Sequence, residues 1–322
     1  MKKVFALAII LCLLVQGMIS CSSPVKPSSV EKETYVFAIR EGETLRLNKY
    51  AKVDEDTAKP CVIFVFGGGF VGGSRDSDYN SAFMQRLVEN GYVAIAIDYR
   101  LGMKNAKMGS EFDPEQFGML MQNTIQIAVE DLFAATRFVY EHADEWQINT
   151  DWIVACGSSA GAITVLQGEY LICNNSELSR LLPNGFRYGG IISFAGAIFN
   201  MGDELTWSAN PSPIQLFHGD ADRNVPYNKA TMESMGGLFG SKYIADQLKA
   251  LKTPYYFYEI GNAAHEIAGE PMAQNIEEIN SFIRGMVIDR KPYMIHMAVE
   301  DMNRPETEKE FTLIDYIITN YQ

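Results

Sequence analysis

Short apolar runs alternate with longer amphipathic segments through most of the chain, and this alternation constrains the fold more than any other feature. The runs span 61–66, 92–98, 152–156, 190–196, 214–218 and 255–260. Each is apolar at consecutive positions, as a strand covered by helices on both faces must be. Helical periodicity fills the intervals at 79–90, 124–142, 160–173, 241–252 and 271–286. We therefore predict an α/β fold with a mostly parallel central sheet and helices on both faces.

The two ends of this pattern define the expected domain, which spans 34–287. Residues 35–40 and 44–50 flank the turn sequence Glu-Gly-Glu and predict an antiparallel hairpin at its start. Residues 288–322 form a C-terminal extension for which we expect no strand partner. Pro305 favours the start of a helix that packs on the domain. The apolar face of that helix would contain Phe311, Ile314, Ile317 and Ile318.

The N-terminus predicts export. Lys2 and Lys3 precede an apolar stretch that is too short for a membrane span, so we expect residues 1–20 to be a signal peptide. Cys21 resembles the lipidated cysteine of bacterial lipoproteins, although Met18 stands where those proteins usually have leucine. The resemblance implies a lipoprotein of the bacterial cell envelope, in the periplasm or at the outer membrane, with residues 21–33 as lipid anchor and tether. Plain secretion is the alternative.

The charge of the chain limits its partners. The formal net charge is −13, and it becomes −15 without residues 1–20, which contain two lysines and no acid. Phosphate backbones and anionic lipid surfaces would repel such a chain, and no basic stripe offsets the effect. We therefore expect no nucleic-acid partner, and membrane contact only through the lipid anchor.

Cysteine and histidine spacing argues against disulfides and metals. Cys61, Cys156 and Cys173 are odd in number and widely spaced, so we expect buried free thiols rather than a disulfide framework. The sequence has no CxxC and no HExxH motif, and its four histidines have no metal-ligand spacing. We predict no metal and no cofactor.

Glycine-flanked serines follow the apolar run at 152–156, in the sequence Gly157-Ser158-Ser159-Ala160-Gly161. Ligand sites of open parallel sheets lie beyond the carboxyl ends of the strands, so this is where reactive side chains are expected. Only Ser159 has glycine two residues before and two residues after it. A serine on a sharp strand-to-helix turn projects from the sheet, and the close backbone there requires small neighbours. Ser159 is therefore the candidate nucleophile.

Three other runs end in residues that complete this chemistry. Gly67, Gly68 and Gly69 follow the run at 61–66, and their amides can approach a substrate oxygen because no side chains block them. Asp220 and Asp222 follow the run at 214–218, and His265 follows the run at 255–260. The order serine, acid, histidine is the one found in hydrolases built on such a sheet.

Five stretches resemble the α/β-hydrolases, nearest the carboxylesterases and hormone-sensitive-lipase-like esterases with an HGGGF oxyanion motif. They are FGGGFVGGS at 66–74, IDYRLG at 97–102, AVEDLFAATRFV at 128–139, GSSAG at 157–161 and HGDADRNVP at 218–226. The resemblance covers about residues 60–285. It implies Ser159 as nucleophile, Asp222 as acid and His265 as base, with the amides of Gly68, Gly69 and Ala160 forming the oxyanion hole. Phe66 departs from the pattern because it replaces the first histidine of the motif, which leaves the loop's supporting hydrogen bonds open.

Each assignment has a competitor. Asp220 is the alternative acid, but the family pattern HGxxD followed by Val-Pro selects Asp222. His218 is expected to order the turn after its strand. A surface histidine with no catalytic role is the alternative for His265, but His142 lies in a predicted helix and His296 beyond the last predicted strand.

The substrate pocket is harder to predict. The interval at 197–213, where such hydrolases usually carry a lid, is short, which argues against a large cap domain. Trp207 would stack on a sugar or aromatic ring, or else simply pack. The interval at 101–123 is rich in methionine and phenylalanine, so it either adapts to different acyl groups or packs as a crossover loop. The candidate pocket residues are Phe70, Phe117, Met119 and Trp207.

The leading interpretation is a serine carboxylesterase that hydrolyses short acyl or aryl esters through an acyl-enzyme. Its substrates would be small-molecule or glycan esters, with acetylated or feruloylated carbohydrate among the candidates. A peptidase or amidase on the same fold is the first alternative. The second is a non-catalytic binding protein, although such proteins commonly lose the nucleophile or the base, and Ser159 and His265 are both present.

Overall fold

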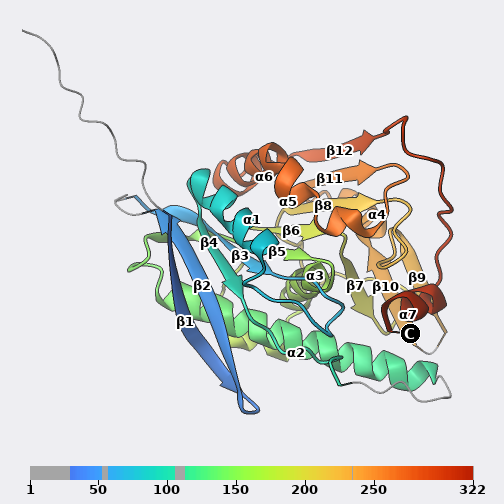
Figure 1. Ribbon diagram of the computed structural model, residues 1–322, viewed down its shortest axis with the longest axis horizontal. Coiled ribbons are helices and arrows are strands. Elements are labelled where there is room, and N and C mark those ends of the chain that lie inside the picture. Colours follow the sequence, from blue (N-terminus) through green and yellow to red (C-terminus); the bar gives the residue numbers. More distant parts are fainter. Residues whose placement is uncertain (1–29, 53–56, 106–112, 234, 322) are drawn as a thin grey trace, which may run out of the picture.

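Nine strands form the central sheet, in the order β1-β2-β4-β3-β5-β6-β8-β11-β12 (Figure 1). The computed structural model describes residues 30–52, 57–105, 113–233 and 235–321. The strands are β1 Val30–Arg40, β2 Glu43–Lys52, β3 Lys59–Val65, β4 Val93–Ile97, β5 Ile148–Ser158, β6 Gly190–Phe194, β8 Ile214–Gly219, β11 Tyr255–Ile260 and β12 Met294–Val299. β1 pairs antiparallel with β2 and β2 with β4, and every adjacent pair from β4 to β12 is parallel. The predicted parallel sheet and N-terminal hairpin are confirmed.

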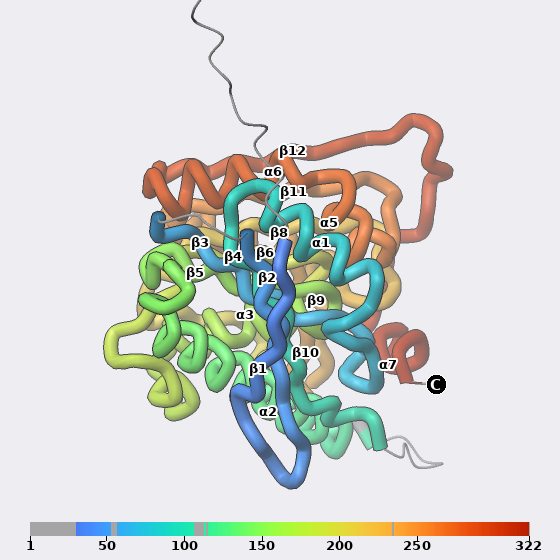
Figure 2. The backbone as a smooth tube through the Cα atoms, turned by 60° about the vertical axis from the view of Figure 1, so that its left-hand side comes forward, coloured from blue at the N-terminus to red at the C-terminus, as the bar shows by residue number. Residues whose placement is uncertain are grey.

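Helices cover both faces of this sheet. They are α1 Asp78–Glu89, α2 Pro114–Glu141, α3 Ala160–Cys173, α4 Ser241–Ala250, α5 Pro271–Gln274, α6 Ile276–Phe282 and α7 Leu313–Tyr321, with a π-helical turn at Ile283–Ile288. α1 and α6 lie on one face and α2 and α3 on the other (Figures 1 and 2). On the α1 face the rings of Phe64 and Phe194 pack against Phe83 at centroid distances of 5.6 and 5.9 Å. β3, β4, β6 and β8, which are covered in this way, are buried along their whole length.

α2 is much longer than the sequence pattern predicted. It begins at Pro114, where the Asp113 side chain accepts hydrogen bonds from the Glu115 and Gln116 amides. An aspartate cap followed by proline is a helix-start signal. The second half of the interval at 101–123 is therefore the first turns of a helix, and residues 106–112 of that interval lie outside the described residues.

The C-terminal extension differs from the prediction in two ways. β12 pairs in parallel with β11, so the expectation of no strand partner is wrong. The strand was missed because it lies at the sheet edge, where Met294 and Met297 are exposed, and it lacks a buried apolar run. The final helix begins at Leu313 rather than near Pro305, and it buries Leu313, Tyr316 and Ile317 while Ile314 and Ile318 remain half exposed.

The start of the domain and the interval at 197–213 also differ in detail. β1 begins at Val30, so the folded domain starts four residues before the expected boundary at Thr34. The predicted signal peptide and Cys21 lie outside the described residues. The short interval begins with β7, Ala197–Asn200, which joins β10, Gly236–Gly240, and β9, Lys229–Met232, in a small antiparallel sheet.

The three cysteines of the domain are buried free thiols, as predicted. Burial raises the pKa of Cys61 and Cys156 well above the ordinary value, since a thiolate would be desolvated there. Within the described ranges, no helix combines the length and apolar character that crossing a bilayer requires.

Candidate active site

The turn from β5 to α3 holds Ser159 in a strained conformation. Its φ is 50° and its ψ is −117°, a combination that non-glycine residues rarely adopt. The flanking glycines are needed for close packing. A Cβ on Gly157 would lie 2.2 Å from the Gly161 carbonyl oxygen, and a Cβ on Gly161 would lie 2.0 Å from the Val65 carbonyl oxygen. The glycine spacing that singled out Ser159 in the sequence therefore has a steric cause.

The structure brings the three predicted catalytic side chains together. Oγ of Ser159 lies 2.9 Å from Nε2 of His265, and Nδ1 of His265 lies 2.7 Å from Oδ2 of Asp222. They come from the turns after β5, β11 and β8, which end at the same edge of the sheet because these strands are parallel. His265 faces a carboxylate oxygen at Nδ1 and a hydroxyl at Nε2, so it can take the serine proton while the carboxylate fixes its tautomer.

Asp222 is held as a carboxylate. Burial would raise the pKa of this carboxyl, but hydrogen bonds from His218 and His265 outweigh burial and hold the pKa well below its usual range. The other oxygen, Oδ1, accepts the amides of Asn224 at 2.7 Å and Val225 at 3.0 Å. Both carboxylate oxygens of Asp222 therefore have hydrogen-bond donors, which fix the carboxylate in place.

The glycine loop, residues 67–70, lies beside Ser159. Gly68, Gly69 and Phe70 have φ values of 127°, 60° and 61°, so three consecutive residues are in left-handed conformations. Gly67 through Gly69 line the same cleft as Ser159 and His265. Among the described residues, the amides of Gly68 and Gly69 donate to no backbone carbonyl. The Ala160 amide is the first of α3 and has no acceptor within the helix. These three amides are free to bind a developing oxyanion.

Phe66, which replaces the histidine of the related motif, packs rather than hydrogen-bonds. Its ring lies 4.6 Å from that of Tyr99, and the Tyr99 hydroxyl donates to the Phe66 carbonyl oxygen at 2.9 Å. Phe66 is buried. At this position the loop is therefore supported by a tyrosine that bonds to its backbone.

A cleft of about 590 Å³ opens above Ser159. Four residues predicted to line the substrate pocket do not line it. Phe70 is buried in the core, Phe117 packs against Tyr321 at a centroid distance of 5.7 Å, and Met119 is exposed on α2. Trp207 packs edge-on against Tyr170 at 5.0 Å, so the packing alternative describes it correctly. These expectations are wrong because apolar character, on which they rested, marks residues that pack as well as residues that bind.

Small and polar side chains line the cleft instead. They include Ser74, Ser77, Asn80, Asn224, Thr319 and Asn320, with Val71, Tyr79, Ala268 and Met272 supplying the apolar part. Thr319 and Asn320 come from α7, and no pattern in the sequence indicates that the C-terminus returns to the site. Asn224 follows Asp222 by two residues, and this proximity was the signal available in the sequence.

The competing residues have other partners. Asp220 accepts the Asn262 amide at 2.6 Å and pairs with Lys309, so it is not bonded to His265. His296 lies in β12 and pairs with Glu259, while His142 caps the end of α2. In the described part of the chain, no group of three or more histidine, cysteine or acidic residues has the arrangement of a metal site.

Comparisons with known proteins find similarity to esterases. A protein-family model described as BD-FAE matches residues 47–113. Gut esterase 1 of Caenorhabditis briggsae is 31% identical over 133 residues, which are 41% of this chain and 22% of that protein. Carboxylesterase 1C of Mus musculus is 30% identical over 140 residues, 42% of this chain and 23% of that protein. The matched stretches span less than a quarter of either relative.

Solved structures extend the similarity to most of the domain. Thermogutta terrifontis esterase 2 phosphoramylated by tabun superposes with a TM-score of 0.56 at 20% identity, over 80% of this chain and 94% of that one. The apo form of the same esterase gives a TM-score of 0.56 at 19% identity, again over 80% of this chain and 94% of that one. The parallel sheet, its covering helices and this superposition show that the chain has the α/β-hydrolase fold.

Proposed function

We propose that the protein is a serine carboxylesterase that hydrolyses short acyl or aryl esters. One observation carries the proposal: the hydrogen-bonded series from Ser159 through His265 to Asp222 opens into a cleft lined by the glycine loop. A core histidine that only stabilises the fold has no need of a strained serine on one side and a buried carboxylate on the other.

The reaction follows from the positions of these groups. His265 accepts the Ser159 proton as Oγ attacks the ester carbonyl, and Asp222 stabilises the imidazolium that forms. The amides of Gly68, Gly69 and Ala160 bind the oxyanion of the tetrahedral intermediate, and each such donor typically lowers the barrier by about 3 kcal/mol. Departure of the alcohol with the histidine proton leaves an acyl-enzyme, which water hydrolyses by the reverse sequence of proton transfers.

The cleft supports a small, polar substrate. Its volume of about 590 Å³ suits a short acyl group, and serine, threonine and asparagine side chains line much of its wall. Hydroxyl and amide groups of this kind bind the hydroxyl groups of a sugar. Esters of carbohydrate, acetylated or feruloylated, are therefore our proposed substrate class. Trp207 does not stack on this substrate, because it lies outside the cleft.

We also propose that the protein is a lipoprotein of the bacterial envelope, anchored through Cys21. The support is the basic and apolar composition of residues 1–20 and the small residues before the cysteine. Metabolic labelling with a fatty acid should mark the full chain, and Cys21→Ser should abolish the label. Equal labelling of both would refute the anchor.

A substrate panel tests the catalytic proposal. We expect the full chain to hydrolyse p-nitrophenyl acetate and acetylated oligosaccharides but not an aminoacyl p-nitroanilide. Ser159→Ala is the control for contaminating hydrolases. Hydrolysis of the anilide alone would indicate a peptidase, and hydrolysis of no substrate would indicate a binding protein.

A further inference from the structure

The chain after β12 returns across the loops that carry the catalytic residues (Figures 1 and 2). Near its start, Arg304 forms an ion pair with Glu266, the residue that follows His265. Three residues later, the Thr307 amide donates to Asn262 Oδ1 at 3.3 Å. Both partners belong to the turn after β11, so the extension is attached to the loop of the base.

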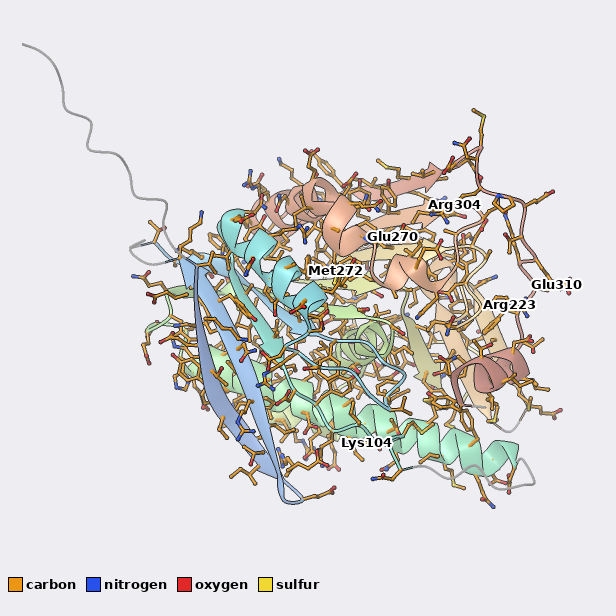
Figure 3. All side chains as sticks on the ribbon, viewed as in Figure 1. Lys104, Arg223, Glu270, Met272, Arg304 and Glu310 are labelled. Carbon is orange, nitrogen blue, oxygen red and sulfur yellow. The ribbon has the colours of Figure 1, made fainter. Side chains whose placement is uncertain are left out.

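The same segment then reaches the loop of the acid. Nζ of Lys309 lies 2.6 Å from Oδ2 of Asp220, and Nη1 of Arg223 donates to the Glu310 carbonyl oxygen at 3.3 Å. Figure 3 shows Arg223 and Glu310 close together where the extension runs down to α7. Asp220 and Arg223 flank Asp222, so the extension contacts this loop on both sides of the catalytic carboxylate.

The last residues of α7 contact the cleft itself. Nδ2 of Asn320 donates to the Asn224 carbonyl oxygen at 2.8 Å, and the Tyr321 hydroxyl donates to the Gly69 carbonyl oxygen at 3.3 Å. Thr319 and Asn320 line the cleft together with Gly69 and Asn224. α7 therefore joins the acid loop to the glycine loop.

The glycine loop depends on hydrogen bonds to fix its backbone, because glycine restricts its own conformation less than any other residue. Gly68 and Gly69 have no side chains to restrict them, and φ is positive at both and at Phe70. Hydrogen bonds from within residues 66–103 hold the carbonyls of Phe66, Gly68 and Phe70. The Gly69 carbonyl is held from outside that segment, by Tyr321, which is 252 residues away in the chain.

We propose that Tyr321 is a positioning residue that fixes the glycine loop for oxyanion binding, so that the C-terminal extension is part of the active site. The proposal rests on the esterase function proposed above. Two contacts orient the Tyr321 side chain toward Gly69. Its ring packs against Phe117, and its hydroxyl lies 3.3 Å from that of Tyr316. Burial raises the pKa of Tyr321 to about 12, so the hydroxyl stays protonated, and able to donate, at any ordinary assay pH.

Tyr321→Phe in the full chain tests this role, because it removes the hydroxyl and keeps the ring against Phe117. We expect kcat for p-nitrophenyl acetate to fall about tenfold with KM nearly unchanged. This fall in kcat is smaller than the loss of about 10²-fold or more that follows removal of an oxyanion donor itself. Amide hydrogen exchange in a peptide covering 66–72 should become faster. Tyr188→Phe is the matched control, since that buried hydroxyl bonds to Thr136 Oγ1 and does not line the cleft.

The outcomes separate this inference from the proposed function. A lower kcat and faster loop exchange in Tyr321→Phe, with Tyr188→Phe unchanged in both, would support the positioning role. Wild-type kcat and wild-type loop exchange in Tyr321→Phe, in a chain that is otherwise an active esterase, would overturn the inference and leave the esterase proposal standing. An inactive unmodified chain that forms no adduct with a fluorophosphonate would overturn both.

Discussion

Nε2 of His218 lies 3.3 Å from Oδ2 of Asp222, the same oxygen that accepts the hydrogen bond from His265. This nitrogen also lies 3.3 Å from the Val225 carbonyl oxygen, so it faces two acceptors and must carry a proton. Nδ1 of His218 lies 2.8 Å from Ser241 Oγ. His218 is fully buried, and this contact supports the carboxylate of Asp222.

His218→Phe is expected to lower kcat about tenfold, because the buried Asp222 loses a donor while the shape of the site is roughly kept. His142→Phe is the matched control, since its Nδ1 bonds to the Phe138 carbonyl oxygen at the end of α2. Steady-state kinetics of both variants check this. Equal kcat values in wild type and His218→Phe would contradict the role given to His218.

The close packing around Gly161 makes a steric prediction. Gly161→Ala places a Cβ 2.0 Å from the Val65 carbonyl oxygen, whereas Gly285→Ala places one in open space. Gly161→Ala should lower the free energy of unfolding by at least about 3 kcal/mol or prevent folding. Gly285→Ala, in a helical turn, should be neutral or slightly stabilising. Thermal denaturation distinguishes the two, and similar melting temperatures would contradict the packing described for the turn.

Asp222 gives a prediction about pH. Its folded pKa is held below the ordinary value of 3.8, so its ionised form stabilises the fold above that pH, and the contribution is lost as the pH falls through the lower folded pKa. Denaturant unfolding of Asp222→Asn beside wild type should show a stability deficit that is constant down to about pH 4 and shrinks below it. Equal free energies of unfolding of the two proteins already at about pH 6 would contradict the lowered pKa of Asp222. At neutral pH kcat of Asp222→Asn should fall about 10⁴-fold, because the carboxylate holds the His265 imidazole in the tautomer that accepts the serine proton.

Trp207 provides a prediction about what the site excludes. It packs against Tyr170 and does not line the cleft, and its Nε1 is buried without a hydrogen-bond partner among the described residues. Trp207→Ala should therefore lower the free energy of unfolding by about 2 kcal/mol and leave KM unchanged. A higher KM for acetylated oligosaccharides, with stability unchanged, would return Trp207 to the pocket.

The sequence predicts those features that one local rule determines. A parallel strand buried on both faces needs consecutive apolar residues, which is why the core strands were found. The turn at Ser159 needs glycine at 157 and 161, because a Cβ at these positions would lie 2.2 and 2.0 Å from backbone carbonyl oxygens. The triad candidates were recognisable because each follows a predicted strand within a few residues, and the resemblance to the α/β-hydrolases selected Asp222 over Asp220.

Features that depend on long-range contacts were missed. β12 is an edge strand with exposed methionines, so its residues resemble those of a loop. Thr319 and Asn320 line the cleft, and Tyr321 bonds to Gly69, only because the extension crosses the sheet edge, and no pattern within α7 indicates this. The pocket residues were misassigned because Phe117 and Trp207 pack against aromatic neighbours, which composition alone cannot distinguish from binding.

The most direct test of the central claim is labelling with a fluorophosphonate, followed by peptide mass spectrometry. Ser158 is the internal control, since its Oγ donates to the Ala268 carbonyl oxygen at 2.7 Å instead of to the histidine. The geometry predicts one adduct, on Ser159, that persists in Ser158→Ala and disappears in Ser159→Ala. An intact chain that gains no adduct, or an adduct that remains in Ser159→Ala, would contradict the assignment of Ser159 as the nucleophile.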